Sequence, residues 1–530
     1  MATKWWGWGD ESKSFAPADP ERFWSFVERR LGGAGESPRL ESVDEIRLPP
    51  SRLDAGVAAA LRRAAGENAV AVENADRAVH SLGKGYRDLV RIRRGEITRP
   101  VDAVVYAESD AQVAAVLEAA ARAGVAVIPF GGGTSVVGGV EPVGEGTAVT
   151  LDLAHMGRVL DIDDTSGLAT VEAGMFGPAL EARLNAAGFT LGHFPQSFEY
   201  STVGGWIATR SAGQNSTRYG KIEDNIESVR MLFPGGAIDT PAVPAAAAGP
   251  DLNQVIAGSE GALGVITRAT LRLAPLPQQS DYRAYLMPSF EEGTEASREM
   301  LQAGLRPAVL RLSDEPESEA TALMQAGVEG MTMCLCIVGF DGDEDEVRFS
   351  WQRAEAILGR HGGQSLGTGP GEAWRRSRFE APYLRDVLLD HAIMVDTLET
   401  ATTWSNYLKL YRSVRDAMQN AMGDRGLVMA HLSHAYTHGA SVYYTFLARQ
   451  HEGREMEQWQ EVKDAASRAI IEGGGALSHH HGIGTEHRRW LRDYLGDGGM
   501  KVLRALKQAF DPQGIMNPAK LISTEETQDV

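Results

Sequence analysis

The order of apolar and polar positions changes near residue 99, and this change divides the chain. Before it, helical patterns alternate with loops. After it, short apolar runs alternate with Ala-rich amphipathic stretches, which predicts strands followed by helices. Residues 102–107 predict a strand. Residues 110–123 predict a helix that begins after Ser109 and ends at Gly124. Residues 125–130 predict a second strand, and a glycine loop follows it at once.

The strand-and-helix pattern continues to about residue 277 and then changes. Further strands are predicted near residues 148–153, 168–173, 229–233 and 261–267, before Pro275 and Pro277 mark a boundary. Beyond it, strand patterns such as 332–340 mix with amphipathic helices such as 404–422, and a tail contains a helix at 499–510. We therefore predict an α+β protein in four segments: 1–95, 96–277, 278–475 and 476–530.

Composition fits a globular protein of more than one core. The chain has 530 residues, of which 43% are hydrophobic and 23% charged, so long disorder is not expected. The formal net charge of −19 opposes binding to nucleic acid and to anionic lipid surfaces. An anionic substrate would need a local cluster of Arg, Lys and His side chains.

Several signals bear on location. Cys334 and Cys336 share one apolar run, and we expect buried thiols in a reducing compartment. No apolar stretch reaches the ~18 residues of a membrane span. The start has no signal-peptide pattern and the end, 527–530, no peroxisomal address, so we expect a cytoplasmic protein. Aromatic residues crowd the first 26 positions; they indicate a strap on the main body, or an element for substrate access or for peripheral contact with the inner membrane surface.

Three loops rich in small residues lie within the α/β segment. They are Gly131–Ser135, residues 195–206 and residues 258–264. Glycines let the backbone approach a diphosphate, and successive N–H groups can bind an anion. Three such loops favour one long cofactor over three unrelated turns, although none is a Walker loop or a G-x-G-x-x-G fingerprint.

Histidine and arginine are the remaining candidates for chemistry. His479, His480 and His481 are consecutive. A second set of histidines, His431, His434 and His438, comes earlier in the chain. Three interpretations stay open for the histidines: a polar loop, a metal site, or a proton-transfer and anion-binding cluster. Arg311 and Arg385 lie beside apolar residues and need an anionic partner, either a ligand or an internal carboxylate.

A family resemblance adds to these patterns. The three small-residue loops resemble the vanillyl-alcohol-oxidase (PCMH-type) FAD-binding fold. Residues 4–9 (KWWGWG), 192–197 (GHFPQS), 219–224 (YGKIED) and 478–482 (SHHHG) are similar to the alkyldihydroxyacetonephosphate synthase branch of that fold. The similarity runs from residue 4 to about 495. It implies a helical N-terminal segment, a PCMH-type FAD-binding domain of two α/β subdomains at 96–277, an α+β cap domain at 278–475, and a C-terminal helical segment with the His loop.

The resemblance implies FAD, which we expect to be bound non-covalently because no tethering motif is present. The implied FAD-binding residues are Pro129, Gly131, Gly132, Gly133, Thr134, Ser135, Gln196, Ser197, Ser201, Thr202, Gly204, Gly205, Ala208, Thr209, Arg210, Glu260, Gly261, Gly264, Val265 and Ile266.

The family activity is a redox-neutral exchange in ether-lipid synthesis. A fatty alcohol replaces the acyl group of acyl-dihydroxyacetone phosphate, while the substrate carbon is held on flavin N5. The resemblance makes Tyr443 the general base through a lowered pKa. It makes Arg385 the phosphate ligand and Arg311 a further essential arginine. His193, His479, His480 and His481 are expected around the reacting carbons, no metal is expected, and we expect a homodimer.

Two features depart from the synthase branch. The set of His431, His434 and His438 is not a feature of that branch, and the ending at residues 511–518 is similar to FAD-dependent D-2-hydroxy-acid dehydrogenases, which often bind a divalent metal through two His and a Glu. His480 stands where those relatives have a Glu ligand. The alternative function is therefore an FAD-linked dehydrogenase or oxidase of a hydroxy acid or related alcohol; a membrane-associated flavoprotein scaffold is a third class.

Overall fold

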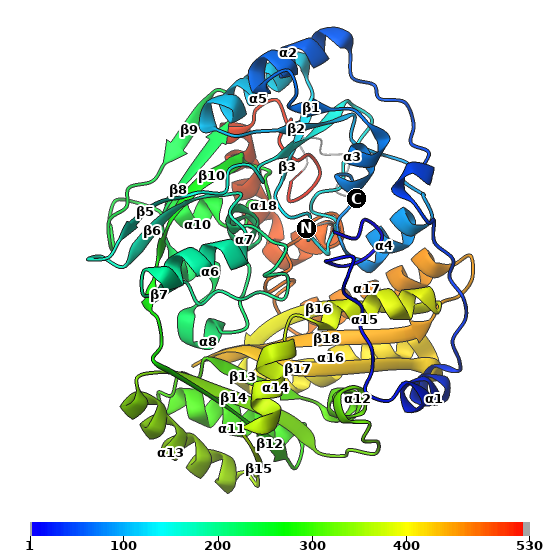
Figure 1. The fold of residues 1–530 in the computed structure, drawn as a ribbon, viewed down its shortest axis with the longest axis vertical. Coiled ribbons are helices and arrows are strands. Elements are labelled where there is room, and N and C mark those ends of the chain that lie inside the picture. The colour runs from blue at the N-terminus through cyan, green and yellow to red at the C-terminus, as the bar shows by residue number, and fades with distance from the viewer. Residues whose placement is uncertain (1–2, 523–530) are drawn as a thin grey trace.

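The computed structural model describes residues 3–522 and has two halves (Figure 1). The upper half holds two sheets with their helices, and the lower half holds one large sheet. The N-terminal chain starts in the middle, descends to α1 (Pro20–Leu31) beside the lower sheet, and returns upward past η1 (Val43–Glu45) to α2 (Ala55–Ala65). The mixed α+β fold is as predicted. The predicted tail beyond residue 522 lies outside the described residues.

The first sheet has the order β1-β2-β4-β3. β2 (Ala103–Tyr106), β4 (Ala148–Asp152) and β3 (Ala126–Phe130) are parallel, and β1 (Val70–Ala71) is antiparallel to β2. The helix α5 (Asp110–Ala123) joins β2 to β3 as predicted, because the Ser109 hydroxyl caps its first turn and Gly124 ends it with a φ of 63°. The other helices here are α3 (Asn74–Val79) and α4 (Tyr86–Arg93).

The second sheet is antiparallel and has the order β5-β6-β10-β8-β9. Its strands and the elements around it are β5 (Val159–Asp163), β6 (Leu168–Glu172), β8 (Ile226–Phe233), β9 (Gly236–Asp239), β10 (Val265–Arg272), α6 (Gly177–Ala186), α7 (Val203–Thr209), α8 (Ser216–Tyr219), α9 (Ile222–Asn225) and α10 (Leu252–Ile256). One continuous apolar core joins both upper sheets. A short pair, β7 (Phe189–Thr190) with β11 (Ala274–Pro275), precedes the passage to the lower half.

The lower sheet has seven antiparallel strands in the order β15-β12-β14-β13-β17-β18-β16. They are β12 (Gln279–Met287), β13 (Val309–Ser313), β14 (Cys334–Gly342), β15 (Gln364–Gly367), β16 (Ile393–Thr403), β17 (Gly426–Tyr436) and β18 (Gly439–Arg449). One face packs on α11 (Phe290–Gln302), α13 (Glu344–Arg360), α16 (Trp404–Met422) and α17 (Glu455–Glu472). The opposite face is turned toward the upper half.

The remaining helices and the C-terminal segment join the halves. α12 (Glu315–Ala326), α14 (Gly369–Ser377) and α15 (Ala381–Asp390) lie by the lower sheet. η2 (Gly423–Arg425) follows α16, and η3 (Arg488–Trp490) leads into α18 (Leu491–Phe510), which starts earlier than predicted and is kinked at Gly496. After α18, Met516 pairs with Val127 of β3, so the C-terminal segment adds to the first sheet.

The described residues contain no helix that is both long and apolar enough to cross a membrane. Cys334 and Cys336 are buried free thiols on one strand, as expected. The four segment boundaries stay our proposal, because the N-terminal segment contributes α1 to a core of the lower half and Leu61 of α2 to the core of the upper half.

Candidate functional site

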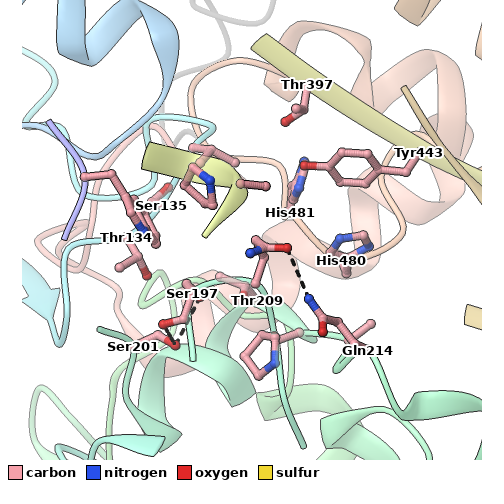
Figure 2. Close-up of a pocket in the computed structure, with 18 of the residues that line it drawn as sticks. Thr134, Ser135, Ser197, Ser201, Thr209, Gln214, Thr397, Tyr443, His480 and His481 are labelled. Carbon is pink, nitrogen blue, oxygen red and sulfur yellow. Dashed lines mark hydrogen bonds between the residues drawn. The ribbon is translucent and has the colours of Figure 1, made fainter. Parts of the chain in front are cut away.

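A cavity of about 650 Å³ lies between the glycine loops of the upper half and the inner face of the lower sheet. Figure 2 shows the hydroxyls of Thr134, Ser135 and Ser201 on one side of this cavity, with Tyr443 and His480 on the other. Residues from the N-terminal segment, α12, α14 and α15 complete the wall. The sequence therefore brings its predicted cofactor loops and its predicted acid–base residues to one place.

The first glycine loop is shaped for close approach. It leaves the end of β3 directly, and a Cβ on Gly132 would overlap the carbonyl oxygen of Tyr200. A Cβ on Gly131 would overlap the Thr202 hydroxyl. Gly133 has a φ of 64°, in the left-handed region that favours glycine. Only glycine fits this loop, which leaves its backbone open to a cofactor.

The second and third loops add polar groups around the same space. The Ser201 hydroxyl accepts hydrogen bonds from Ser197 at 3.1 Å and from the Trp206 indole at 2.7 Å. Glu260, from the third loop, accepts the N–H groups of Ile483 and Gly484 at 2.7 Å each. Burial raises the pKa of Glu260 to about 7. Glu260 thus ties a cofactor loop to the segment just after the three histidines.

Most predicted FAD residues line the cavity, and two do not. Arg210 ends α7 with a φ of 52°, and its guanidinium donates to the carbonyls of Ala257 and Gln254 at 3.0 and 2.7 Å. Val265 is fully buried in the core of the second sheet. The other predicted residues, from Pro129 to Ser135 and at positions 196, 197, 201, 202, 204, 205, 208, 209, 260, 261, 264 and 266, are at the cavity wall.

Strand register assembles the other wall. Tyr443 of β18 is paired with Glu399 of β16 on one side and with His431 of β17 on the other. Directly paired residues point to the same face of a sheet, so these three side chains form a row. The neighbours Val442 and Tyr444 point into the core on the opposite face, where each is fully buried. The row cannot be seen in the sequence without this register.

Tyr443 stands among imidazole rings. Its ring lies parallel to His431 with centroids 4.9 Å apart, and 5.5 Å from the ring of His481 at nearly a right angle. Burial raises the pKa of Tyr443 to about 12, although a hydrogen bond with Thr397 lowers it in part. The expectation of a lowered pKa is therefore wrong for this protein without its ligands: the buried phenol keeps its proton because the phenolate would lose its hydration.

Arg311 and Arg385 differ in their partners: one is paired with an internal carboxylate and the other is available for a ligand. Arg311 donates to Glu317 at 2.8 Å and to Nε2 of His431 at 3.0 Å, while Nδ1 of His431 lies 3.0 Å from Glu317. Because arginine can only donate, Nε2 of His431 accepts and Nδ1 carries the proton. Burial opposes ionisation of Glu317, but His431 and Arg311 lower its pKa to about 2. Arg311 therefore has an internal carboxylate partner.

Arg385 has no such partner among residues 3–522. Its Nε and one terminal nitrogen are buried without a hydrogen bond, although the side chain lines the cavity. Its closest described aromatic contact is the ring of Trp8, 6.0 Å from the guanidinium. Buried donors left unsatisfied are costly, so this guanidinium is suited to an anionic ligand in the cavity.

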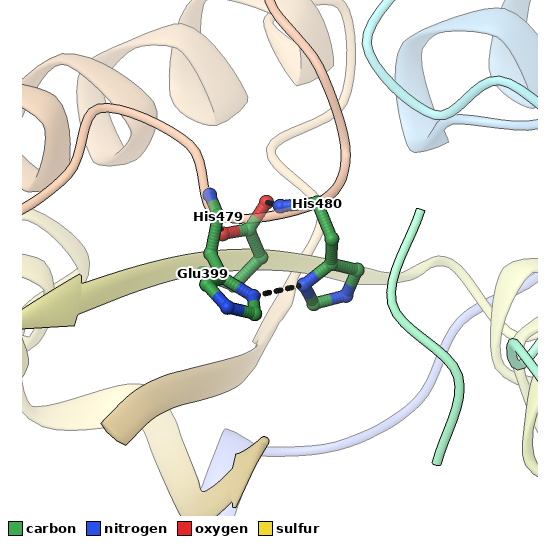
Figure 3. Close-up of side chains that lie close together, drawn as sticks. All are labelled: Glu399, His479 and His480. Carbon is green, nitrogen blue, oxygen red and sulfur yellow. Dashed lines mark hydrogen bonds between the residues drawn. The ribbon is translucent and has the colours of Figure 1, made fainter. Parts of the chain in front are cut away.

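The three consecutive histidines are held by one carboxylate. Glu399 accepts the backbone N–H groups of His479, His480 (3.1 Å) and His481 (2.8 Å), and the hydroxyl of Ser478 at 2.8 Å. Figure 3 shows the carboxylate above the two imidazoles, beside the backbone of the loop; the Nδ1 atoms of the two rings lie 3.0 Å apart. Glu399, His479 and His480 bring three ligand atoms within 4.8 Å of one another. Three of the four hydrogen bonds end on Oε1 and one on Oε2, and because they hold the backbone of three successive residues we interpret the cluster as the anchor of the histidine loop.

The histidines do not form one set. His480 and His481 line the cavity, whereas His479 bonds to the Tyr436 hydroxyl at 2.7 Å outside it. His193 is 1% exposed behind Trp206, with ring centroids 4.9 Å apart, and both its ring nitrogens are unpartnered among the described residues. Burial lowers the pKa of His193 to about 3.

The second histidine set is only partly at the site, because its segment is a strand and the turn after it: His431 and His434 line the cavity, and the ring of His434 lies 5.0 Å from that of His480, whereas His438 does not line it. A helix would have put all three rings on one face. Instead His431 bonds to Glu317, and His434, at a bulge with a φ of 45°, bonds to the Ser216 hydroxyl at 2.8 Å. His438 stacks on Tyr436 away from the cavity.

Comparison with known proteins identifies the family to which this chain belongs. The family model described as "FAD binding domain" matches residues 101–240, and that of "FAD linked oxidases, C-terminal domain" matches residues 276–521. An alkyldihydroxyacetonephosphate synthase of Trypanosoma brucei brucei is 34% identical, covering 93% of this chain and 85% of the relative. One from Dictyostelium discoideum is 33% identical, covering 98% and 93%. The chain belongs to the alkyldihydroxyacetonephosphate synthase family. The predicted resemblance is thereby confirmed.

Solved structures agree with the assignment to the alkyldihydroxyacetonephosphate synthase family. A structure of such a synthase matches with a TM-score of 0.86 at 30% identity, covering 98% of this chain and 99% of that one. A p-cresol methylhydroxylase matches with a TM-score of 0.72 at 15% identity, which shows that the PCMH-type fold is shared. A glycolate oxidase subunit of Bacillus subtilis is 26% identical over 81% of this chain and 90% of that relative.

As a member of the alkyldihydroxyacetonephosphate synthase family with these FAD-binding domains, the chain is an FAD protein, and its own residues fit that cofactor. The loop at Gly131 and Gly132 has no room for side chains, and hydroxyls surround the adjoining space. Several residues of the wall were not among the predicted site residues, including Trp8, Glu317, Thr397 and Arg378. An isolated Glu or Arg on a helix gives no local signal. Only Trp8 had a signal in the sequence, because it belongs to the Trp-Gly run at residues 4–9.

Proposed function

We propose that this chain is an FAD-dependent synthase that exchanges the acyl group of acyl-dihydroxyacetone phosphate for a fatty alcohol. The observation that carries the proposal is Arg385, whose buried nitrogens have no partner among residues 3–522 and which stands at the wall of a cavity that Tyr443 and His481 also line. A phosphate would satisfy those nitrogens through two parallel hydrogen bonds. The anion-binding group and the acid–base groups therefore share one chamber with the cofactor loops.

The rest of the wall suits a long hydrocarbon chain. Beside Arg385, the cavity is bounded by apolar side chains from the N-terminal segment, α12, α15 and two strands of the lower sheet: Phe15, Met324, Leu384, Val395 and Met429. Burying a methylene group against such a surface stabilises a complex by ~0.8 kcal/mol. A lipid phosphate could therefore bind with its phosphate at Arg385 and its alkyl chain along this apolar surface.

FAD supplies an electron-deficient ring system that can hold and release the reacting carbon without net oxidation. The residues that we propose to bind it line the first loop, at 131–135, and the second, at 196–209, with Glu260 and Gly261 from the third. No covalent attachment is proposed. The first loop packs so closely on Tyr200 and Thr202 that Gly131 and Gly132 have no room for a side chain.

Proton transfer is divided between a phenol and imidazoles. Burial lowers the pKa of His481, and it lowers the pKa of His480 well below the usual value, so both rings are neutral near pH 7 and each has an unprotonated nitrogen. Tyr443 is a protonated phenol at the same pH and can donate one. We propose that an imidazole takes the proton from C1 of the substrate, and that Tyr443 is the adjacent proton relay.

Arg311 has a supporting role in this proposal. Its charge is matched by Glu317 and it fixes the tautomer of His431. His431 in turn stacks on the ring of Tyr443. Arg311 thus positions the phenol through His431, while Arg385 binds the phosphate. His193 and His479 are proposed to support Trp206 and Tyr436 at the edges of the site.

The exchange balances without an electron acceptor. The bond between C1 and the acyl oxygen breaks, and the fatty acid leaves as a carboxylate. The alcohol oxygen forms the new bond to C1 and loses its proton. The proton taken from C1 at the start is returned to C1 at the end, so the flavin finishes as it began.

A hydroxy-acid dehydrogenase remains the second candidate, because the glycolate oxidase relative spans most of this chain and three ligand atoms gather at Glu399. The test is anaerobic mixing of the FAD-loaded enzyme with each substrate. We expect a D-2-hydroxy acid to leave the flavin oxidised, and acyl-dihydroxyacetone phosphate followed by a fatty alcohol to give an alkyl ether. Bleaching by the hydroxy acid, without ether formation, would replace our proposal by the second candidate.

The homodimer, a peripheral contact with the membrane surface and a cytoplasmic location stay predictions.

A further inference from the structure

The first residues of the chain form a hairpin at the cavity, which we call the N-terminal hairpin (residues 3–10). Thr3 and Asp10 pair as an antiparallel bridge, and the Lys4 N–H donates to the Gly9 carbonyl at 2.7 Å. Trp8, at its tip, is 5% exposed and lines the cavity. The proton transfers and cofactor contacts proposed above give this hairpin no role.

The hairpin is built around the carboxylate of Asp386 in α15. Asp386 accepts from the Lys4 ammonium at 3.1 Å and from the Trp8 N–H at 3.0 Å. The side chains of Lys4 and Asp386 are each 4% exposed. A Cβ on Gly7 would lie 2.6 Å from a carboxylate oxygen, so only glycine allows the backbone to come so near. A buried carboxylate is therefore paired by a residue 382 positions away in the chain.

Asp386 directly follows Arg385, the proposed phosphate ligand. An uncompensated carboxylate at position 386 would place a negative charge one residue from Arg385 and would oppose the binding of an anion there; because successive side chains diverge on a helix, this effect is electrostatic and needs no direct pair. Because Lys4 compensates Asp386, the charge of Arg385 is left without a carboxylate partner among residues 3–522. The indole of Trp8, 6.0 Å from the Arg385 guanidinium, adds a cation–π contact at the cavity side.

The hairpin also joins the cofactor loops to α15. The Asp10 N–H faces the hydroxyls of Tyr200, in the second loop, and Tyr383, in α15, at 3.0 and 3.2 Å. The Lys84 ammonium donates to the Lys4 carbonyl at 2.9 Å from the upper half. The position of the helix that carries Arg385 is thus fixed relative to the proposed FAD site.

We propose that the N-terminal hairpin determines phosphate specificity: Lys4 neutralises Asp386, so that Arg385 is kept for the substrate phosphate, and Trp8 forms the wall beside the guanidinium. Lys4 and Trp8 are positioning residues that act through Arg385. The inference rests on the proposed function, because that function supplies the phosphate.

The test is a double-mutant cycle on the FAD-loaded enzyme with dihydroxyacetone phosphate as the probe. Lys4→Met keeps most of the side-chain volume and removes the charge. We expect the affinity for the probe, measured by calorimetry, to fall about tenfold or more, the loss typical of a charged hydrogen bond. Adding Asp386→Asn should restore the affinity, because no uncompensated negative charge is then left beside Arg385. Lys13→Met is the control, since Lys13 is in an exposed pair with Glu199.

Each outcome decides a different point. Unchanged affinity in Lys4→Met, or a loss that Asp386→Asn does not reverse, would overturn the role of the hairpin, since a merely structural defect would persist in the double variant. Uncharged dihydroxyacetone should bind all variants equally, and selective loss of the phosphorylated probe supports the inference. If the wild-type enzyme binds no phosphorylated probe at all, the proposed function itself fails.

Discussion

Replacing Tyr443 by Phe removes one oxygen from the centre of the cavity and keeps the ring between His431 and His481. A positioned acid–base group contributes ~10²–10⁴-fold to rate. The ring contacts at 4.9 and 5.5 Å need no hydroxyl, so FAD content and substrate KM should stay near wild type. We therefore expect kcat to fall ~10²-fold or more, measured as ether formed per bound FAD.

The neighbouring residue supplies a matched control. Tyr444→Phe also removes a phenolic oxygen, but that hydroxyl points into the opposite core and donates to the carbonyl of Tyr411 at 3.1 Å. Its loss should cost about 1 kcal/mol of unfolding free energy and leave kcat unchanged. If Tyr443→Phe retained more than about a third of the wild-type kcat, or if both variants lost activity equally, the relay through Tyr443 would be refuted.

The pH dependence of the same reaction tests whether the pKa of Tyr443 is raised or lowered. The ordinary pKa of a tyrosine is 10, and burial raises that of Tyr443 to about 12. If the phenolate were the active form, kcat would rise about tenfold per pH unit between pH 8 and 10. We expect no such rise, because the protonated phenol is the working form and persists through this range.

Two further variants test the cofactor side. Gly132→Val should abolish most FAD binding because its Cβ would overlap the Tyr200 carbonyl, whereas Gly146→Ala, in open space, should bind FAD normally; flavin absorbance per protein measures both. The pKa of Glu260 is raised from 4.5 to about 7, so its protonated form favours the fold below pH 4.5 and that contribution is lost as the pH rises through 7. Glu260→Gln should thus flatten the fall of Tm between pH 5.5 and 8.5, with a change on the order of 1–3 kcal/mol; an unchanged slope would place the titrating group elsewhere.

Local signals in the sequence predicted what depends on neighbours along the chain. The helix at 110–123 was predicted with its cap and stop because Ser109 and Gly124 act on the backbone beside them. The glycine loop was predicted because a strand ends where the glycines begin. The long helix at 404–422 followed from its apolar periodicity and has the predicted bounds.

What the sequence could not provide depends on register and on distant pairs. Tyr443 and Arg385 were named from the resemblance, and no local pattern shows that Glu399, His431 and Tyr443 form one row. The two arginines looked alike in sequence, yet one is paired with Glu317 and the other is not. The environment that raises the pKa of Tyr443 likewise exists only after the two halves of the molecule meet.

The proposed exchange is tested most directly by the origin of the ether oxygen. The FAD-loaded enzyme would be mixed with acyl-dihydroxyacetone phosphate and a fatty alcohol labelled with ¹⁸O, anaerobically and without an electron acceptor. The masses of the products would then be measured by mass spectrometry. We predict an alkyl ether that keeps the ¹⁸O label and a released fatty acid without it. No ether, or an ether whose oxygen comes from the dihydroxyacetone phosphate, would contradict the proposed exchange.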